Sequence, residues 1–153
     1  MIVPDINLLI YAHNDQAPEH SRARAWWEAA LNGKVAVGLP WISIGGFIRL
    51  MTHPRVLARP MDIHQAILHV RSWLVQPPVR ILHPGSRFET LFFDYLAQLG
   101  SGGNLTTDAQ LAALAVEHQA ELHSCDFDFA RLACWPEYGT VCGPGAWAAD
   151  SGR

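Results

Sequence analysis

The chain has 153 residues, of which 50% are hydrophobic and 16% are charged, with a formal net charge of −3. This length and composition fit one globular domain with a sizeable core and exclude a disordered chain. They also exclude a broad basic surface for duplex nucleic acid, and no apolar run approaches the ~20 residues that span a bilayer.

The N-terminus and the cysteines bear on the location of the protein. The first residues lack the basic region of a secretory signal. The three cysteines are odd in number and lack the spacing of a metal site, so we expect reduced thiols at Cys125, Cys134 and Cys142. The sequence therefore predicts a cytoplasmic protein.

The predicted elements alternate along the chain between short apolar strands and amphipathic helices. We expect strands at 1–3, 35–39, 79–82 and 121–124, with an edge strand near Val141. We expect helices at 7–12, 18–31, 41–51, 63–74 and 86–99, another from Asp108 to near His118, and a turn of helix at 130–132. This alternation, without internal repeats, predicts one α/β domain with a mainly parallel sheet.

Four of the fourteen acidic residues stand at junctions between predicted elements. Asp5 ends the first strand, Asp108 opens an Ala- and Leu-rich helix, and Asp126 and Asp128 follow the strand at 121–124. Strand C-termini and helix N-termini meet at one edge of a parallel sheet, so these acids are expected to converge. Clustered carboxylates repel each other unless a cation such as Mg²⁺ neutralises them.

A simpler interpretation of each acid stays open. Aspartate is favoured at helix N-caps and in turns, where its carboxylate accepts backbone N–H groups. Asp108, for example, stands where a cap of its helix would be expected. Four caps meeting by accident at one predicted edge is the less economical interpretation, and we therefore favour an acidic site.

The order and spacing of several short motifs resemble those of PIN domains, and more narrowly those of the toxin ribonucleases of VapBC toxin–antitoxin pairs. The acids lie within residues 3–9, 104–115 and 124–130. Residues 46–54 and 79–85 are also similar to stretches of one branch of these toxins. Each motif is weak alone, whereas their succession covers nearly the whole chain.

The resemblance implies a PIN-like three-layer α/β/α fold over residues 1–143, followed by a loose C-terminal tail at 144–153. It implies a Mg²⁺- or Mn²⁺-dependent endoribonuclease that cuts tRNA, rRNA or mRNA with metal-activated water. It also implies a homodimer that a cognate VapB-like antitoxin inhibits.

By position in these motifs, the resemblance makes Asp5 and Asp108 the principal metal ligands. Asp126 becomes a further catalytic acid and metal ligand, with Asp128 beside it as a catalytic acid. Ser124 stands where the family usually has Ser or Thr near the site. Asn7 fits the polar position that hydrogen-bonds the first acid.

The chain departs from the family at Gly46, where many PIN domains carry a Glu just before the Phe of the third helix. One carboxylate fewer leaves the number of metal ions open, and we expect weak metal binding without RNA. Arg49, one helical turn away, is a candidate phosphate ligand, although an exposed helix arginine is an equally ordinary interpretation.

Two other functions remain open from the residues. A binding module could use the same acidic pocket to capture RNA or a partner without cutting it, and the absence of an acid at Gly46 keeps this alternative open. A small phosphatase-like hydrolase with Asp5 as nucleophile is weaker, because Asn7 stands where a second acid is expected. The eight histidines lack the spacing of a zinc site.

Overall fold

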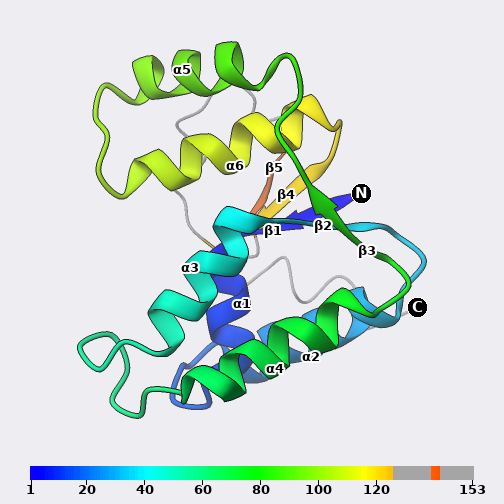
Figure 1. The fold of residues 1–153 in the computed structure, drawn as a ribbon, viewed down its shortest axis with the longest axis vertical. Coiled ribbons are helices and arrows are strands. Elements are labelled where there is room, and N and C mark those ends of the chain that lie inside the picture. Colours follow the sequence, from blue (N-terminus) through cyan, green and yellow to red (C-terminus); the bar gives the residue numbers. More distant parts are fainter. Residues whose placement is uncertain (126–138, 142–153) are drawn as a thin grey trace.

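The computed structural model describes residues 1–125 and 139–141. Strands and helices alternate along this part of the chain, as Figure 1 shows. Their bounds, in chain order, are β1 (Ile2–Pro4), α1 (Ile6–His13), α2 (His20–Asn32), β2 (Val37–Pro40), α3 (Trp41–Met51), α4 (Ile63–Leu74), β3 (Val79–Leu82), α5 (Phe88–Leu99), α6 (Leu105–Glu117), β4 (Glu121–Ser124) and β5 (Gly139–Val141).

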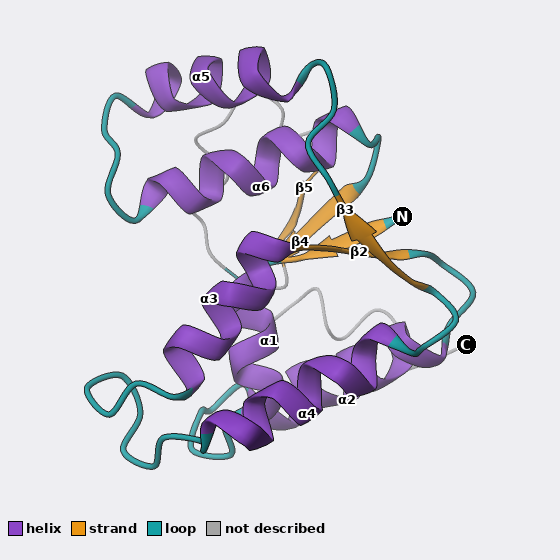
Figure 2. Cartoon of the chain, viewed as in Figure 1, coloured by secondary structure: helices purple, strands orange, loops and turns teal. Residues whose placement is uncertain are grey.

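The strands form one sheet in the order β3-β2-β1-β4-β5, and every pair is parallel. The first strand lies at the centre, where Ile2 pairs with Val37 on one side and with Glu121 on the other. Because all strands run the same way, their carboxyl ends share one edge, next to the start of α1 and α3 (Figure 2). The predicted parallel sheet and the edge strand at Val141 are confirmed.

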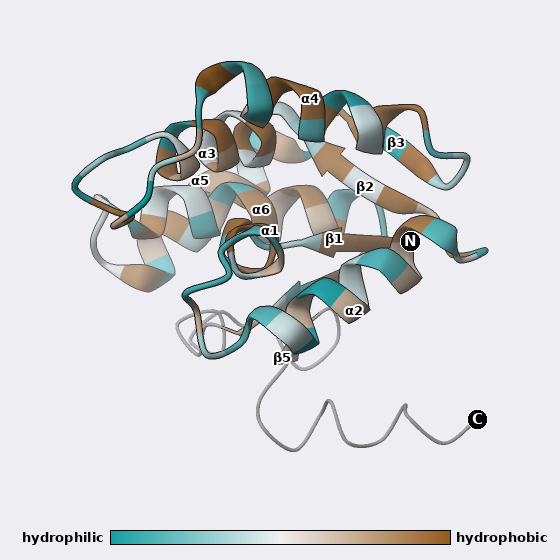
Figure 3. Cartoon of the chain, turned by 90° about the horizontal axis from the view of Figure 1, so that it is seen from below, coloured by the Kyte–Doolittle hydropathy of each residue, from teal (hydrophilic) through white to brown (hydrophobic). Residues whose placement is uncertain are grey.

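Helices cover both faces of the sheet and bury two separate hydrophobic clusters. The first cluster joins α1, α2, α3 and α4 around Trp27, Phe47 and Trp73. The second joins α5 and α6 to the opposite face around Tyr95 and Leu111. In Figure 3 the brown, apolar ribbon lies in β1, β2 and α1 at the centre of the molecule. This is the three-layer α/β/α arrangement that the resemblance implies.

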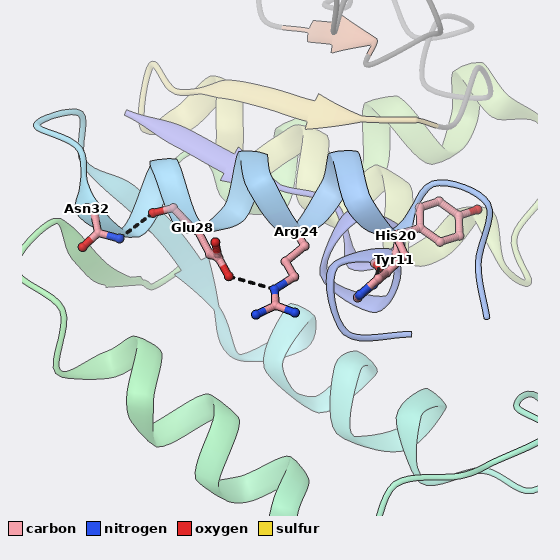
Figure 4. A network of polar contacts seen from close by, with 5 residues as sticks. All are labelled: Tyr11, His20, Arg24, Glu28 and Asn32. Carbon is pink, nitrogen blue, oxygen red and sulfur yellow. Dashed lines mark hydrogen bonds and ion pairs between the residues drawn. The ribbon is translucent and has the colours of Figure 1, made fainter. Parts of the chain in front are cut away.

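The second helix is held by its buried face and not by its surface charges. Ala23 and Trp27 are buried against the core. Arg24 donates to Glu28 over 2.8 Å, and Asn32 donates to the Glu28 carbonyl over 2.7 Å (Figure 4). Exposed pairs of this spacing contribute only about 0.3–0.5 kcal/mol each, so burial of the apolar stripe decides the position of the helix.

Three predicted helix starts are wrong by two or more residues. The second helix begins at His20 and not at residue 18. The sixth helix begins at Leu105, so Asp108 lies inside its first turn and is not the N-cap. The fifth begins at Phe88, two residues later than expected. There the Glu117 carboxylate accepts the backbone N–H groups of Gly85 and Arg87, both over 2.8 Å, and so satisfies them outside the helix.

Several predictions concern residues outside the described part of the chain. The turn of helix at 130–132 and the loose tail at 144–153 both lie there. The division into a domain over 1–143 and a tail therefore stays a prediction. Within residues 1–125 and 139–141, no helix combines the length and the apolar character that a membrane span requires.

One histidine is built into the first cluster. His13 donates from Nδ1 to the Leu9 carbonyl over 2.7 Å and packs edge-on against Phe47. Burial lowers the pKa of His13 from the usual 6.5 to about 4, with smaller contributions in the same direction from His69, His20 and Arg24, while the Leu9 hydrogen bond opposes the shift. At neutral pH the native protein therefore holds this imidazole uncharged.

We expect His13 to make the fold acid-sensitive. In the unfolded chain the imidazole takes up a proton near pH 6.5, whereas in the native protein it does so only near pH 4. Stability is therefore complete above pH 6.5 and is lost as the pH falls towards 4. From about pH 7.5 to about pH 5 the loss from this group is about 2 kcal/mol.

Urea unfolding of the wild type and of His13→Gln at both pH values measures this contribution. The variant should lose less stability on acidification than the wild type. His64→Gln, at an exposed position on α4, is the control and should leave the pH dependence unchanged. Equal pH slopes for His13→Gln and the wild type would show that His13 does not cause the effect.

Candidate active site

A cavity of about 610 Å³ opens at the carboxyl edge of the sheet. Three segments that are distant in sequence line it: the end of β1 with the start of α1, the C-terminal half of α3, and the start of α6 with the loop before it. The lining residues are Asp5, Ile6, Asn7, Arg49, Leu50, Gly103, Asn104, Leu105, Thr107 and Asp108. Four of the residues singled out in the sequence thus share one cavity.

Asp5 is the buried acid of this cavity. It follows β1 directly, its backbone N–H donates to the His123 carbonyl over 2.8 Å, and the residue is only 3% exposed. It occupies the N-cap position of α1, yet its side chain makes no capping hydrogen bond. The Asp5 side chain therefore does not cap α1.

Ser124 holds the Asp5 carboxylate from the neighbouring strand. Its Oγ donates to Asp5 Oδ2 over 2.8 Å, and the serine is fully buried. Burying a carboxylate is costly unless hydrogen bonds or a cation stabilise its charge. The serine supplies one such bond and fixes the direction of the carboxylate, so it acts on Asp5 and is not itself among the residues that line the cavity.

Asp108 approaches from the other side of the sheet. It is half-buried in the first turn of α6, where the electropositive end of the helix favours a negative charge. Behind it, α6 is buried along most of its length through small and apolar residues from Ala109 to Val116. This close packing on the sheet restricts the position of Asp108.

The third helix contributes an arginine to the cavity and, one turn earlier, a glycine packed against α1. Arg49 is exposed and lines the cavity beside Leu50. One turn earlier, a Cβ built on Gly46 would lie 2.5 Å from Cδ1 of Ile6. The isoleucine of α1 therefore occupies the space that a side chain at position 46 would need, where many PIN domains carry a Glu.

Two predicted site residues cannot be placed. Asp126 and Asp128 follow β4, one and three residues beyond Cys125, and lie outside the described residues. Among the residues that the structure describes, no group of three or more His, Cys, Asp or Glu is arranged to hold a metal ion. The described part of the site therefore offers two carboxylates, Asp5 and Asp108.

The side chains that line this cavity fit a hard divalent cation. The side chains able to act as ligands are the carboxylates of Asp5 and Asp108, the amides of Asn7 and Asn104 and the Thr107 hydroxyl, all of which present oxygen. Mg²⁺ and Mn²⁺ prefer oxygen ligands, and Mg²⁺ is commonly held by one or two carboxylates together with waters and substrate phosphates. The donor set therefore agrees with the metal that the resemblance implies.

Some lining residues were missed in the sequence. Thr107 directly precedes Asp108. The predicted helix began only at Asp108, so Thr107 was not recognised as part of the first helical turn that lines the cavity. Gly103 and Asn104, which directly precede α6, were not among the predicted site residues. Ile6 was missed because nothing in its local pattern indicates contact with Gly46, forty residues away.

Comparison with known proteins identifies the family. A profile of the PIN domain matches residues 2–133. Ribonuclease VapC33 of Mycobacterium tuberculosis is 48% identical over 133 residues, which cover 87% of this chain and 93% of that protein.

Solved structures agree in fold. The crystal structure of Mycobacterium tuberculosis VapC20, described as a sarcin-ricin loop cleaving toxin, aligns with a TM-score of 0.63 and 17% identity over 85% of this chain and 93% of that one. VapBC2 from Rickettsia felis, bound to a DNA fragment from its promoter, aligns with a TM-score of 0.61 and 17% identity over 87% and 94%. The domain match and the identity to VapC33 show that this chain belongs to the PIN-domain family, in its branch of VapC ribonucleases.

Proposed function

We propose that this chain is the toxin of a type II toxin–antitoxin pair and that it hydrolyses phosphodiester bonds of RNA as a Mg²⁺- or Mn²⁺-dependent endoribonuclease. The observation that carries the proposal is the convergence of Asp5, at the end of β1, and Asp108, in the first turn of α6, in one cavity with further oxygen donors and an arginine. Membership of the VapC ribonucleases supports the same chemistry.

Each described residue has a distinct role in this proposal. Asp5 and Asp108 hold the divalent cation, and Ser124 positions Asp5 through its hydrogen bond. Asn7, next to Asp5 on α1, offers a polar contact to the site. Arg49 binds a substrate phosphate, since a guanidinium makes paired hydrogen bonds to phosphate oxygens. Asp126 and Asp128 complete the acidic site in our proposal.

Asp5 and Asp108 would hold the divalent cation, which would supply an activated water and stabilise the charge that develops on the phosphate. The protein supplies the geometry. The two carboxylates stand on rigid elements, the end of the central strand and the first turn of a buried helix. Holding the reacting groups in the right geometry supplies a large share of the rate acceleration in enzymes.

The proposal includes partners and a location. A VapB-like antitoxin inhibits the protein, the active form is a homodimer, and the domain extends over residues 1–143. RNA is the substrate, so the protein acts in the cytoplasm. VapBC2 from Rickettsia felis, which shares the fold, offers a precedent for assembly with a partner.

The alternative, a module that binds RNA or a partner without cutting, makes a different prediction for growth. If the acidic site catalyses cleavage, expression of the chain arrests growth and Asp108→Asn relieves the arrest. Arrest that survives Asp108→Asn would favour binding without cleavage.

Asp5 gives the sharpest test of the enzyme. Asp5→Asn keeps the size of the side chain and one oxygen while removing the charge, so we expect cleavage of RNA to fall by at least about 10³-fold and the fold to persist. An assay of total RNA cleavage with Mn²⁺ measures the loss of activity, and circular dichroism measures whether the fold persists. Asp94→Asn, an exposed acid on α5, should cleave as the wild type does. Undiminished metal-dependent cleavage by Asp5→Asn would exclude the proposed role.

Arg49 should contribute to RNA affinity more than to the chemical step. We expect Arg49→Ala to raise KM for RNA by about tenfold while kcat changes less, and Arg49→Lys to restore part of the affinity. Arg71→Ala, at an exposed arginine of α4, serves as the control. A normal KM for Arg49→Ala would assign Arg49 to the surface alone.

We expect the free protein to bind metal weakly, because two described carboxylates leave much of the coordination to water and substrate phosphate. Isothermal titration with Mn²⁺ should give a dissociation constant in the range of about 10⁻⁴ M or weaker. Addition of a non-cleavable RNA should strengthen binding, and removal of the metal with EDTA should stop cleavage. Tight binding at two sites in the free protein would contradict this expectation.

A further inference from the structure

The first helix and the third helix meet at a contact that the proposed activity does not use. Gly46 is buried, and the isoleucine of α1 lies against its backbone. A Cβ at position 46 would meet three atoms of Ile6, at 2.5 Å, 3.3 Å and 3.5 Å. A Cβ here would force Ile6 to shift, so close approach, and not backbone conformation, favours glycine at this position.

The neighbouring glycine provides an internal comparison. Gly45 belongs to the same helix and the same turn, but a Cβ built there meets nothing within 4 Å. Glycine inside a helix is destabilising relative to alanine, other things being equal. Two adjacent glycines of α3 are thus opposite cases: one faces open space and the other accommodates a neighbouring side chain.

Ile6 has little freedom to move away. It is 7% exposed, belongs to the first hydrophobic cluster and lines the acidic cavity next to Asp5. Its branched Cβ restricts rotation in a helix. A rotation that moved only its terminal methyl group would still leave Cγ1 at 3.3 Å from a new Cβ.

The contact lies where α3 could reach the cavity. Leu50, four residues after Gly46 and so on the same face of the helix, lines the cavity. Ile6 lines it as well, directly beside the buried acid. A longer side chain at position 46 would meet Ile6, which itself lines the cavity that contains both described carboxylates.

From this packing we propose that Ile6 and Gly46 form a matched pair that keeps α3 from adding a ligand to the acidic cavity and so limits the cation affinity of the free protein. The proposal rests on the proposed function for the identity of the cation. It makes Ile6 a determinant of metal affinity although it bears no ligand atom. Metal binding then depends more strongly on phosphate oxygens from the substrate.

The packing half of the proposal is tested by thermal unfolding of alanine variants. Gly46→Ala should lower Tm, whereas the matched variant Gly45→Ala should raise it or leave it unchanged. Ile6→Ala should remove the penalty, so that Gly46→Ala no longer lowers Tm in the Ile6→Ala background. If Gly46→Ala raises Tm in the wild type as Gly45→Ala does, the close contact is not the constraint.

The metal half is tested by titrating Mn²⁺ into two double variants that differ only in charge. Ile6→Ala/Gly46→Glu should bind Mn²⁺ at least about tenfold more tightly than Ile6→Ala/Gly46→Gln. The comparison shares the same truncated isoleucine and nearly the same volume. Equal affinities would overturn the proposal.

A second pair of variants covers poor folding of the first. If circular dichroism shows that the Glu and Gln pair does not fold, the shorter pair Ile6→Ala/Gly46→Asp and Ile6→Ala/Gly46→Asn takes its place, with the same expected order. Loss of the native circular dichroism in both pairs, with Ile6→Ala itself folded, would show that position 46 accepts no ligand even when cleared, which contradicts the proposal.

RNA cleavage by the wild type separates this proposal from the proposed function. If the wild type cleaves no RNA with Mn²⁺ while the Glu and Gln variants still differ in Mn²⁺ affinity, the proposed activity fails and the matched pair stands. If the wild type cleaves RNA and the two variants bind Mn²⁺ equally, the activity stands and the matched pair fails.

Discussion

The hydrogen bond from Ser124 to Asp5 is the interaction on which the site depends. It connects the ends of two neighbouring parallel strands, β1 and β4, and both side chains are buried. The bond exists only in one register of the sheet, in which Pro4 pairs with His123. A shift by one residue would turn either side chain to the opposite face, so sheet register and acid geometry are specified together.

The site also depends on how the two hydrophobic clusters are divided. Asp5 leads into α1, which packs in the first cluster, whereas Asp108 belongs to α6, which packs in the second. The cavity lies where the two layers meet at the edge of the sheet. Each helical layer is held by its own packing. The distance between Asp5 and Asp108 therefore depends on how both layers pack against the same five-stranded sheet.

Local signals were enough to predict α3, α4, β3 and β4 with their observed bounds. These elements end at residues with local meaning, such as Asp62, which accepts the N–H of His64. Long-range contacts decided what was missed. The start of α5 depends on Glu117, about thirty residues away, and the fit of Ile6 to Gly46 depends on two helices whose pairing no periodicity reveals. The convergence of Asp5 and Asp108 could be predicted from the parallel topology. The burial of Asp5 could not, because it depends on how distant elements pack around the end of β1.

The central position of the first strand has a consequence for the order in which the protein is made. The serine that holds the acid of this strand lies 119 residues further along the chain, so it is synthesised long after Asp5. A chain cut short before that point lacks both the serine and the strand that fixes Asp5. Because translation runs from β1 towards β4, this arrangement delays a competent site until β4 has been made.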